Sequence, residues 1–259
     1  MKKIILISFA LCLAVPSAFA DWISPLSLEN EPLHGAAPDS ENSPWNIKSA
    51  FDAIDFSKAT EVEDLETVEA LFEDVRDTRS IVDPAHADFI RRTTWLWPND
   101  GCFVRSVHMT KTILEHDGWP VTQLFVFGGS MRAMPEWRDG YEGGLPWNYH
   151  VAPVVRVGST VYVIDPAMDL LQPLELSVWV SRFVRNRASL TGAICSSYTF
   201  GPNADCDASQ FPSEGEGMTL EQWNTYFMPA EWNNIERRSL NPTDLLGSLP
   251  PWASAVSAR

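Results

Sequence analysis

The strongest constraint on the fold is a short turn between two runs of strand-forming residues. Residues 149–157 and 160–165 have the composition of β-strands, and only Gly158 and Ser159 separate them. Glycine at the first central position suits a two-residue type II′ turn, in which Val157 pairs with Thr160. The sequence therefore predicts an antiparallel hairpin whose register is fixed by its turn.

This register brings a histidine and an aspartate together. It places Asp165 opposite Ala152, two residues along the strand from His150. Because side chains alternate between the faces of a strand, His150 and Asp165 share a face as diagonal neighbours, about 7 Å apart at the backbone. Taken alone, Asp165 could simply end a strand before Pro166, and His150 could be a satisfied core histidine. Together they predict a His–Asp hydrogen bond.

Cys102 begins a predicted helix. Apolar residues recur at three- and four-residue steps from Phe103 to Leu114, and Asp117 and Gly118 end the run. The N–H groups and dipole at a helix N-terminus stabilise an anion, which favours the nucleophilic thiolate, and the N–H of Cys102 could donate to an oxyanion. A plainer alternative is a buried cysteine that acts only as a small apolar residue.

The first 20 residues have the pattern of a signal peptide. Lys2 and Lys3 precede an apolar stretch at residues 4–15, and Ala18-Phe19-Ala20 suits cleavage after Ala20. The apolar stretch is too short to span a bilayer, and no later one is long enough. We therefore expect a periplasmic or secreted protein with no membrane segment, beginning at Asp21.

Cysteine pairing in an oxidising compartment leaves one thiol over. Cys195 and Cys206 flank a short stretch with the turn formers Gly201, Pro202 and Asn203, and are expected to form a disulfide. Cys102 then has no partner. An odd cysteine in an exported protein either links two chains or is kept for its reactivity. We expect a monomer with a reactive thiol.

The charge balance excludes some partners. The chain has 19 basic and 34 acidic residues, and loss of Lys2 and Lys3 gives a mature formal charge of −17. Such a charge repels nucleic acids and anionic membranes. It either serves solubility alone or favours neutral and basic protein substrates. No histidine pair has metal-ligand spacing with supporting ligands, and no phosphate-binding loop is found, so neither a metal nor a cofactor is expected.

Composition divides the mature chain into two parts. Residues 21–89 form an acidic segment with an amphipathic helix expected at 59–77, either packed on the main domain or serving as an inhibitory pro-region. Residues 90–259 form the predicted catalytic domain with a C-terminal helical extension. In it we expect a strand at 121–127 that Gly128 and Gly129 end, a cleft-lining loop at 130–147, and helices at 174–183 and 220–228.

Three motifs resemble the bacterial protein-glutaminase family over roughly residues 90–183. They are Asp100-Gly101-Cys102-Phe103-Val104-Arg105 within residues 97–109, Trp147-Asn148-Tyr149-His150-Val151-Ala152, and Ile164-Asp165-Pro166 within residues 163–166. In that family such segments carry a Cys-His-Asp triad, an order also found in papain-like and transglutaminase-like hydrolases. The resemblance implies Cys102 as nucleophile, His150 as base and Asp165 as the group that orients the histidine.

The resemblance also implies a fold and an activity. The fold is α+β and papain- or transglutaminase-like, with the helix that starts at the nucleophilic cysteine packed on an antiparallel sheet. The activity is hydrolysis of glutamine side-chain amides in proteins or peptides through a cysteine thioester, with release of ammonia. Transamidation, peptide cleavage and an inert exported binding or inhibitor protein are the alternatives. Flanking residues expected to line the substrate pocket are Trp97, Asn99, Asp100, Trp147 and Tyr149.

Overall fold

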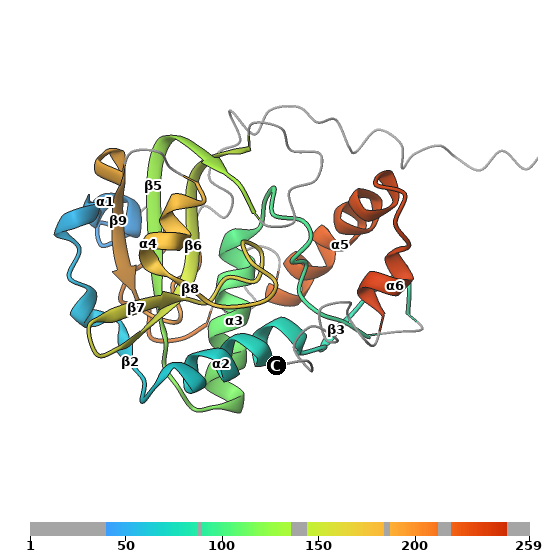
Figure 1. Cartoon of the computed structure of the whole chain (residues 1–259), viewed down its shortest axis with the longest axis horizontal. Helices are drawn as coiled ribbons and strands as arrows, with labels where there is room; N and C mark the ends of the chain where they lie inside the picture. Colours follow the sequence, from blue (N-terminus) through green and yellow to red (C-terminus); the bar gives the residue numbers. More distant parts are fainter. Residues whose placement is uncertain (1–39, 88–89, 136–143, 184–186, 212–218, 248–259) are drawn as a thin grey trace, which may run out of the picture. The chain divides into compact units, whose positions relative to one another are not determined.

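The structure is a computed structural model that describes residues 40–87, 90–135, 144–183, 187–211 and 219–247. The predicted signal peptide, residues 21–39 and residues 248–259 lie outside the described residues. So do the central residues 136–143 of the predicted cleft loop. The described part has an α+β fold built around a largely antiparallel sheet, as the sequence predicts (Figure 1).

Within the described residues, six strands follow one another across this sheet, and a seventh pairs with one of them at the side. In order across the sheet the strands are β1 (Ser49–Ala50), β9 (Thr191–Cys195), β5 (Thr122–Ala133), β6 (Leu145–Val157), β7 (Thr160–Val163) and β8 (Leu174–Glu175). A short strand, β2 (Thr60–Glu61), pairs in parallel with the Val155–Arg156 end of β6. A separate two-stranded ribbon joins β3 (Ile81–Val82) to β4 (Ile90–Arg91).

The β6–β7 hairpin has the predicted register. Val157 faces Thr160, and Gly158 has φ of +58° while Ser159 does not have a positive φ, as a type II′ turn requires. The strand is shorter than expected, because β7 ends at Val163. The Ile164 N–H still donates to Pro153 at 3.0 Å, and Asp165 then opens a turn in which its carbonyl accepts from Met168. The turn leaves the carboxylate at the end of the hairpin ladder.

The prediction that β5 ends at its two glycines is wrong. The strand continues to Ala133 through an irregularity between Phe127 and Met131, and its far end pairs with the beginning of β6 at Leu145. Gly128 has no room for a side chain, since a Cβ there would lie 2.8 Å from Leu190. Much of the predicted loop at 130–147 is therefore strand, because pairing with β6 offsets the low strand propensity of glycine.

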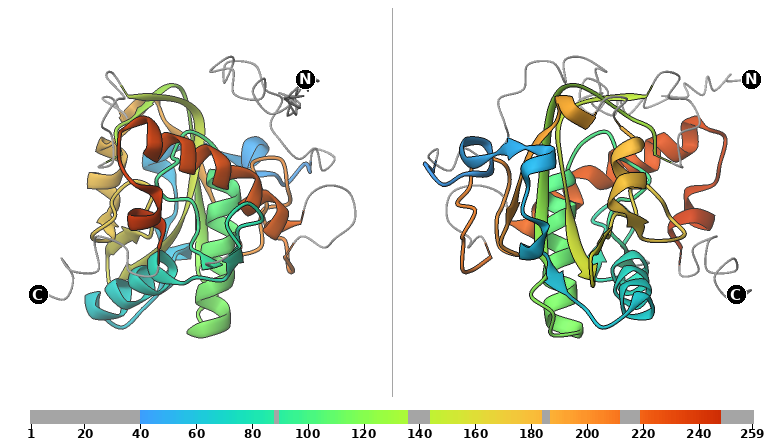
Figure 2. Two further views of the ribbon diagram at one scale, coloured as in Figure 1. Left: turned by 90° about the vertical axis from the view of Figure 1, so that its right-hand side faces the viewer. Right: turned by 60° about the vertical axis from the view of Figure 1, so that its left-hand side comes forward.

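Helix α3 (Cys102–His116) packs against β6 on one side and against α2 (Leu65–Asp77) and α5 (Leu220–Arg237) on others (Figures 1 and 2). Its buried side chains pack in the apolar clusters that also hold the inner residues of β5 and β6. This packing fixes α3 relative to the strands and holds its first residue, Cys102, in the same apolar cluster as Tyr149 of β6.

The acidic N-terminal segment contributes to the main sheet. It contains α1 (Pro44–Ile47), β1, two short 3-10 turns (Phe51–Ala53 and Phe56–Lys58), β2 and α2. Helix α2 starts later than predicted, at Leu65, because the Asp64 side chain caps it by accepting from Thr67 at 2.9 Å. Residues 60–61, inside the predicted helical range, form β2 instead.

The C-terminal half differs from prediction in its helix lengths. Only Leu176–Ser181 (α4) is α-helical within the predicted range 174–183, because its first two residues form β8. A 3-10 turn at Arg187–Ser189 precedes β9. The predicted helix at 220–228 is right at its start but continues as α5 through Pro229 to Arg237, and α6 (Pro242–Leu246) follows. In the part of the chain that the structure covers, no helix has the length and hydropathy of a membrane span.

Candidate active site

The end of the β6–β7 hairpin carries a buried histidine–carboxylate pair. His150 Nε2 lies 2.8 Å from Asp165 Oδ2, and the two residues are 1% and 4% exposed. The same carboxylate oxygen accepts a hydrogen bond from Trp179 Nε1 on α4 at 2.9 Å. Two donors on one oxygen fix the carboxylate, which in turn fixes the imidazole ring.

The electrostatics of this pair favour a charged imidazole. Burial alone would lower the pKa of His150, but the charge and hydrogen bond of Asp165, with a further contribution from Cys102, raise it to about 9. Burial would likewise raise the pKa of Asp165, but His150 and Trp179 outweigh it and the pKa is lowered. Because Nε2 is engaged by the carboxylate, a proton there leaves Nδ1 as the basic nitrogen. Nδ1 is buried, and Cys102 is the further side chain that interacts with this imidazole.

The thiol stands at the first residue of α3. Gly101 caps the helix with φ of +79°, a conformation that side chains rarely adopt, and Cys102 is partly exposed and not in a disulfide. Two neighbouring residues of β6, Tyr149 and His150, interact with Cys102. Cys102 contributes to the raised pKa of His150, and it contributes after burial to the pKa of Tyr149, which lies well above its usual value. The strand thus brings two ionisable side chains to one thiol.

Aromatic rings surround the imidazole. Trp147 stacks on His150 with ring centroids 4.2 Å apart and planes 17° from parallel. The ring centroids of Trp179 and Phe183 lie 5.5 and 6.1 Å from that of His150. These rings exclude water from the His–Asp pair, and low local polarity strengthens the interaction between the two groups.

The predicted pocket residues occupy different places around the thiol. Trp97 and Tyr149 pack in the apolar cluster that includes Cys102, and Trp147 covers His150. Asp100 directs its carboxylate to the N–H of Gly101 at 2.6 Å, which shapes the turn before the cysteine. Asn99 is partly buried in the same turn. Trp97, Trp147 and Tyr149 thus pack near Cys102 or His150, whereas Asn99 and Asp100 lie in the turn that precedes Cys102.

Sequence reasoning missed the polar groups that support this arrangement. Arg105, one turn into α3, is buried and donates to the carbonyls of Trp97 and Asp100 at 3.0 and 2.6 Å. Its spacing of three residues from Cys102 and its charge on an apolar helix face were the available signals. The sequence carries no comparable signal for the roles of Trp179 and α5, because the residues that they contact are distant in sequence.

The remaining predicted features lie away from the thiol. Cys195 and Cys206 form a disulfide with S–S 2.01 Å. Burial lowers the pKa of His108 to about 4. His116, at the end of α3, contacts Asp74 at 2.9 Å, and His86 stacks on Trp232. Among the described residues no cluster of histidine, cysteine and carboxylate side chains could hold a metal ion.

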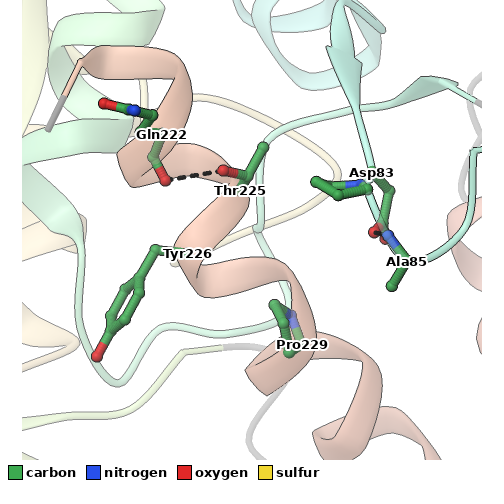
Figure 3. Close-up of a pocket in the computed structure, with 7 residues that line it drawn as sticks. Asp83, Ala85, Gln222, Thr225, Tyr226 and Pro229 are labelled. Carbon is green, nitrogen blue, oxygen red and sulfur yellow. Dashed lines mark hydrogen bonds between the residues drawn. The ribbon is translucent and has the colours of Figure 1, made fainter.

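A separate hollow of about 320 Å³ lies between α5 and the segment after β3 (Figure 3). Asp83 and Ala85 form one wall, and Gln222, Thr225, Tyr226 and Pro229 of α5 form the other. None of the three candidate catalytic residues lines this hollow. The hollow is therefore distinct from the candidate active site.

The His150–Asp165 interaction predicts a characteristic pH dependence of stability. A histidine whose folded pKa of about 9 exceeds its unfolded value near 6.5 adds stability that is fully present below about pH 6.5 and lost as the pH rises through about 9. We expect the excess stability of the wild type over Asp165→Asn to shrink between about pH 6 and pH 10. Thermal unfolding followed by circular dichroism measures it. A constant difference would contradict the raised pKa.

Several solved structures match this chain with low sequence identity and low TM-scores. A mutant of pro-protein-glutaminase is 23% identical over 56% of this chain, with a TM-score of 0.43, and the match spans about half (52%) of that protein. Pro-protein-glutaminase is 20% identical over 77% of this chain and 64% of its own, with a TM-score of 0.47. Protein-glutaminase from Chryseobacterium proteolyticum is 20% identical over 77% and 98%, with a TM-score of 0.41. No curated protein matches the chain.

A family model described as glutaminase matches residues 68–183. The matched segment runs from α2 through α3 and the β5–β6–β7 strands to the end of α4, so it contains Cys102, His150 and Asp165. The match confirms the family resemblance noted in the sequence. Over residues 68–183, this chain is therefore similar to the glutaminase family.

Proposed function

We propose that this protein is a protein-glutamine glutaminase, which hydrolyses the side-chain amide of glutamine in proteins or peptides and releases ammonia. The observation that carries the proposal is the buried His150–Asp165 pair, with Cys102 close enough to contribute to the raised pKa of His150. The family match over the same residues supports the amide as the bond attacked.

The proposed reaction begins with attack on the amide carbon. The Cys102 sulfur, its proton transferred to His150, forms a bond to the carbonyl carbon, and the carbonyl electron pair moves to oxygen. The backbone N–H of Cys102, at the start of α3, is the proposed donor to this oxyanion. His150, held by Asp165, then protonates the nitrogen. The C–N bond breaks, and ammonia leaves a thioester on Cys102.

Water completes the cycle. His150, now neutral, takes a proton from water as the hydroxyl bonds to the thioester carbon, and the C–S bond breaks to give glutamate and the free thiol. This step needs no metal or cofactor, since acid, base and nucleophile are side chains. Asp165 stabilises the imidazolium that forms twice in each cycle.

The aromatic side chains at the site are the proposed walls of the substrate pocket. Trp97 and Tyr149 pack in the cluster that holds Cys102, and Trp147 covers the imidazole. A pocket lined by rings excludes bulk water and suits the apolar methylene groups of a glutamine side chain. Asn99 and Asp100, in the turn before the cysteine, are the proposed polar groups at its rim.

Incubation of the purified protein with a glutamine-containing peptide tests the proposal. We expect a mass increase of about one dalton per converted residue, with an equal amount of ammonia released, because an amide becomes an acid. A shortened peptide would instead indicate peptide cleavage, and cross-linking to an added amine would indicate transamidation. The same peptide with asparagine in place of glutamine is the control. No mass change under any condition would overturn the proposal.

A further inference from the structure

One face of the C-terminal helix α5 holds the segment that leads to Cys102. Phe227, Glu231 and Asn234 are spaced by four and three residues, so their side chains lie along one side of the helix. All three contact residues between Arg91 and Gly101. Helix α5 follows the family-matched segment 68–183, so the family motifs do not account for this contact.

The central contact is a buried carboxylate. Glu231 is 0% exposed, and its Oε1 accepts from the backbone N–H of Leu96 at 2.9 Å. The same carboxylate pairs with Arg91 at 2.5 Å and with Arg92 at 2.9 Å, and Arg91 also pairs with Asp83. Paired in this way, the buried charges fix Glu231 in one orientation, and so fix the backbone of Leu96.

The two flanking contacts extend this clamp. Asn234 Nδ2 donates to the carbonyl of Leu96 at 2.9 Å, so α5 binds both polar groups of one peptide residue. At the other end, the ring of Phe227 lies where a Cβ on Gly101 would come within 2.8 Å. Between them, Arg105 of α3 holds the carbonyls of Trp97 and Asp100. The approach to Cys102 is thereby fixed from two helices.

We infer that Glu231 and Asn234 are positioning residues for the proposed reaction, which hold the turn before Cys102 so that the thiol faces His150. The inference rests on the proposed function for its activity readout. Loss of a contact to Leu96 shifts the turn and with it the thiol. A shift of about 1 Å in a reacting group can lower a rate on the order of 100-fold while substrate binding is largely kept.

Asn234→Ala is the decisive variant, because Asn234 is uncharged and its loss leaves the arginine–carboxylate pairs intact. We expect kcat for ammonia release to fall at least about tenfold, with KM changed less than about twofold. The rate of Cys102 alkylation by iodoacetamide at about pH 6, where unpaired thiols are mostly protonated, should fall in parallel. Glu231→Gln removes the buried charge that pairs with Arg91 and Arg92, and it is compared with the wild type per folded molecule.

Thr219→Ala is the matched control. It removes the side-chain cap of the same helix, at the end away from Leu96, and so lowers the stability of α5 without touching the turn. Both variants are compared per folded molecule, with the folded fraction measured by circular dichroism. Equal kcat and alkylation rates in wild type, Thr219→Ala and Asn234→Ala would overturn the inference.

The two readouts separate this inference from the proposed function. Normal deamidation by the wild type with no effect of Asn234→Ala would refute the positioning role and leave the proposed function standing. Selective loss of alkylation at about pH 6 in Asn234→Ala, in a protein that releases no ammonia, would support the positioning role and refute the proposed function.

Discussion

Replacement of Cys102 by alanine is expected to abolish ammonia release from glutamine peptides. In hydrolases that act through a covalent intermediate, loss of the nucleophile lowers kcat on the order of 10⁶-fold, so we expect a fall of at least about 10⁴-fold. Substrate binding should remain, since the aromatic walls of the site are unchanged. Continuous ammonia detection with a glutamine peptide measures the loss.

Two controls make the Cys102→Ala result specific. The thiol is partly exposed and makes no disulfide, so the variant should unfold at nearly the wild-type temperature. Cys195 and Cys206 are joined to each other, so iodoacetamide should modify Cys102 and cause the same loss in the wild type. Retention of more than about one percent of the activity would refute the proposed nucleophile.

Asp165→Asn is expected to have the second largest effect, on the order of 10³- to 10⁴-fold in kcat. The amide can still contact His150, but its NH₂ group can donate and hold the imidazole in the wrong tautomer, and it does not stabilise the imidazolium. The lowered pKa of Asp165 reflects the same interaction, since His150 favours its charged form. In the wild type, titration of His150 should change the rate as the pH is varied. The pH–rate profile of the variant should lack this change.

Asp169→Asn is the matched control for this substitution. Asp169 is also a buried acid, 3% exposed, four residues further along the same turn, but it pairs with Arg182 at 3.0 Å instead of His150. The control should lose some stability and keep its pH–rate profile. If both variants lose activity equally, the effect of Asp165→Asn is a general effect of losing a buried carboxylate, and the proposed role of Asp165 is wrong.

Local sequence was sufficient to predict the hairpin at the centre of the site. The Gly158-Ser159 turn fixes the register, and the register places the His150 and Asp165 side chains together. A two-residue turn has few conformations, so its geometry carries along both strands without help from the rest of the fold. The start of α5 at Leu220 was also readable from local pattern, since Thr219 and Gln222 form a capping box.

Where the observed ends of β5 and α5 differ from the predicted ones, contacts between distant segments are the cause. Gly128 and Gly129 have low strand propensity, yet β5 continues past them because β6 supplies hydrogen-bond partners. Pro229 lacks a backbone N–H and suggests the end of a helix, yet α5 continues for eight more residues to Arg237. Glu231 and Asn234, just beyond that proline, bind Leu96. Tertiary packing outweighs propensity at both places.

The polar support of the candidate site was not predictable for the same reason. Trp179 reaches Asp165 from α4, and Glu231 reaches Leu96 across 135 residues of sequence. No periodicity or turn rule links such pairs, because their proximity results from the packing of whole helices on the sheet. Arg105 was the exception, since a charged residue one turn after Cys102 on a buried helix face needs partners close by.

The disulfide between Cys195 and Cys206 has a consequence for the choice of production host. Inside the loop that it closes, the carbonyl of Asn203 accepts from the N–H of Ser40, and the N–H of Cys206 donates to the carbonyl of Asn42, so the disulfide loop also anchors the residues that precede α1. In a bacterial cytosol, glutathione keeps thiols reduced, so this disulfide would not form during recombinant synthesis. Three free thiols could then form wrong disulfides during refolding. Preparation with a leader that directs the chain to an oxidising folding environment avoids that scrambling.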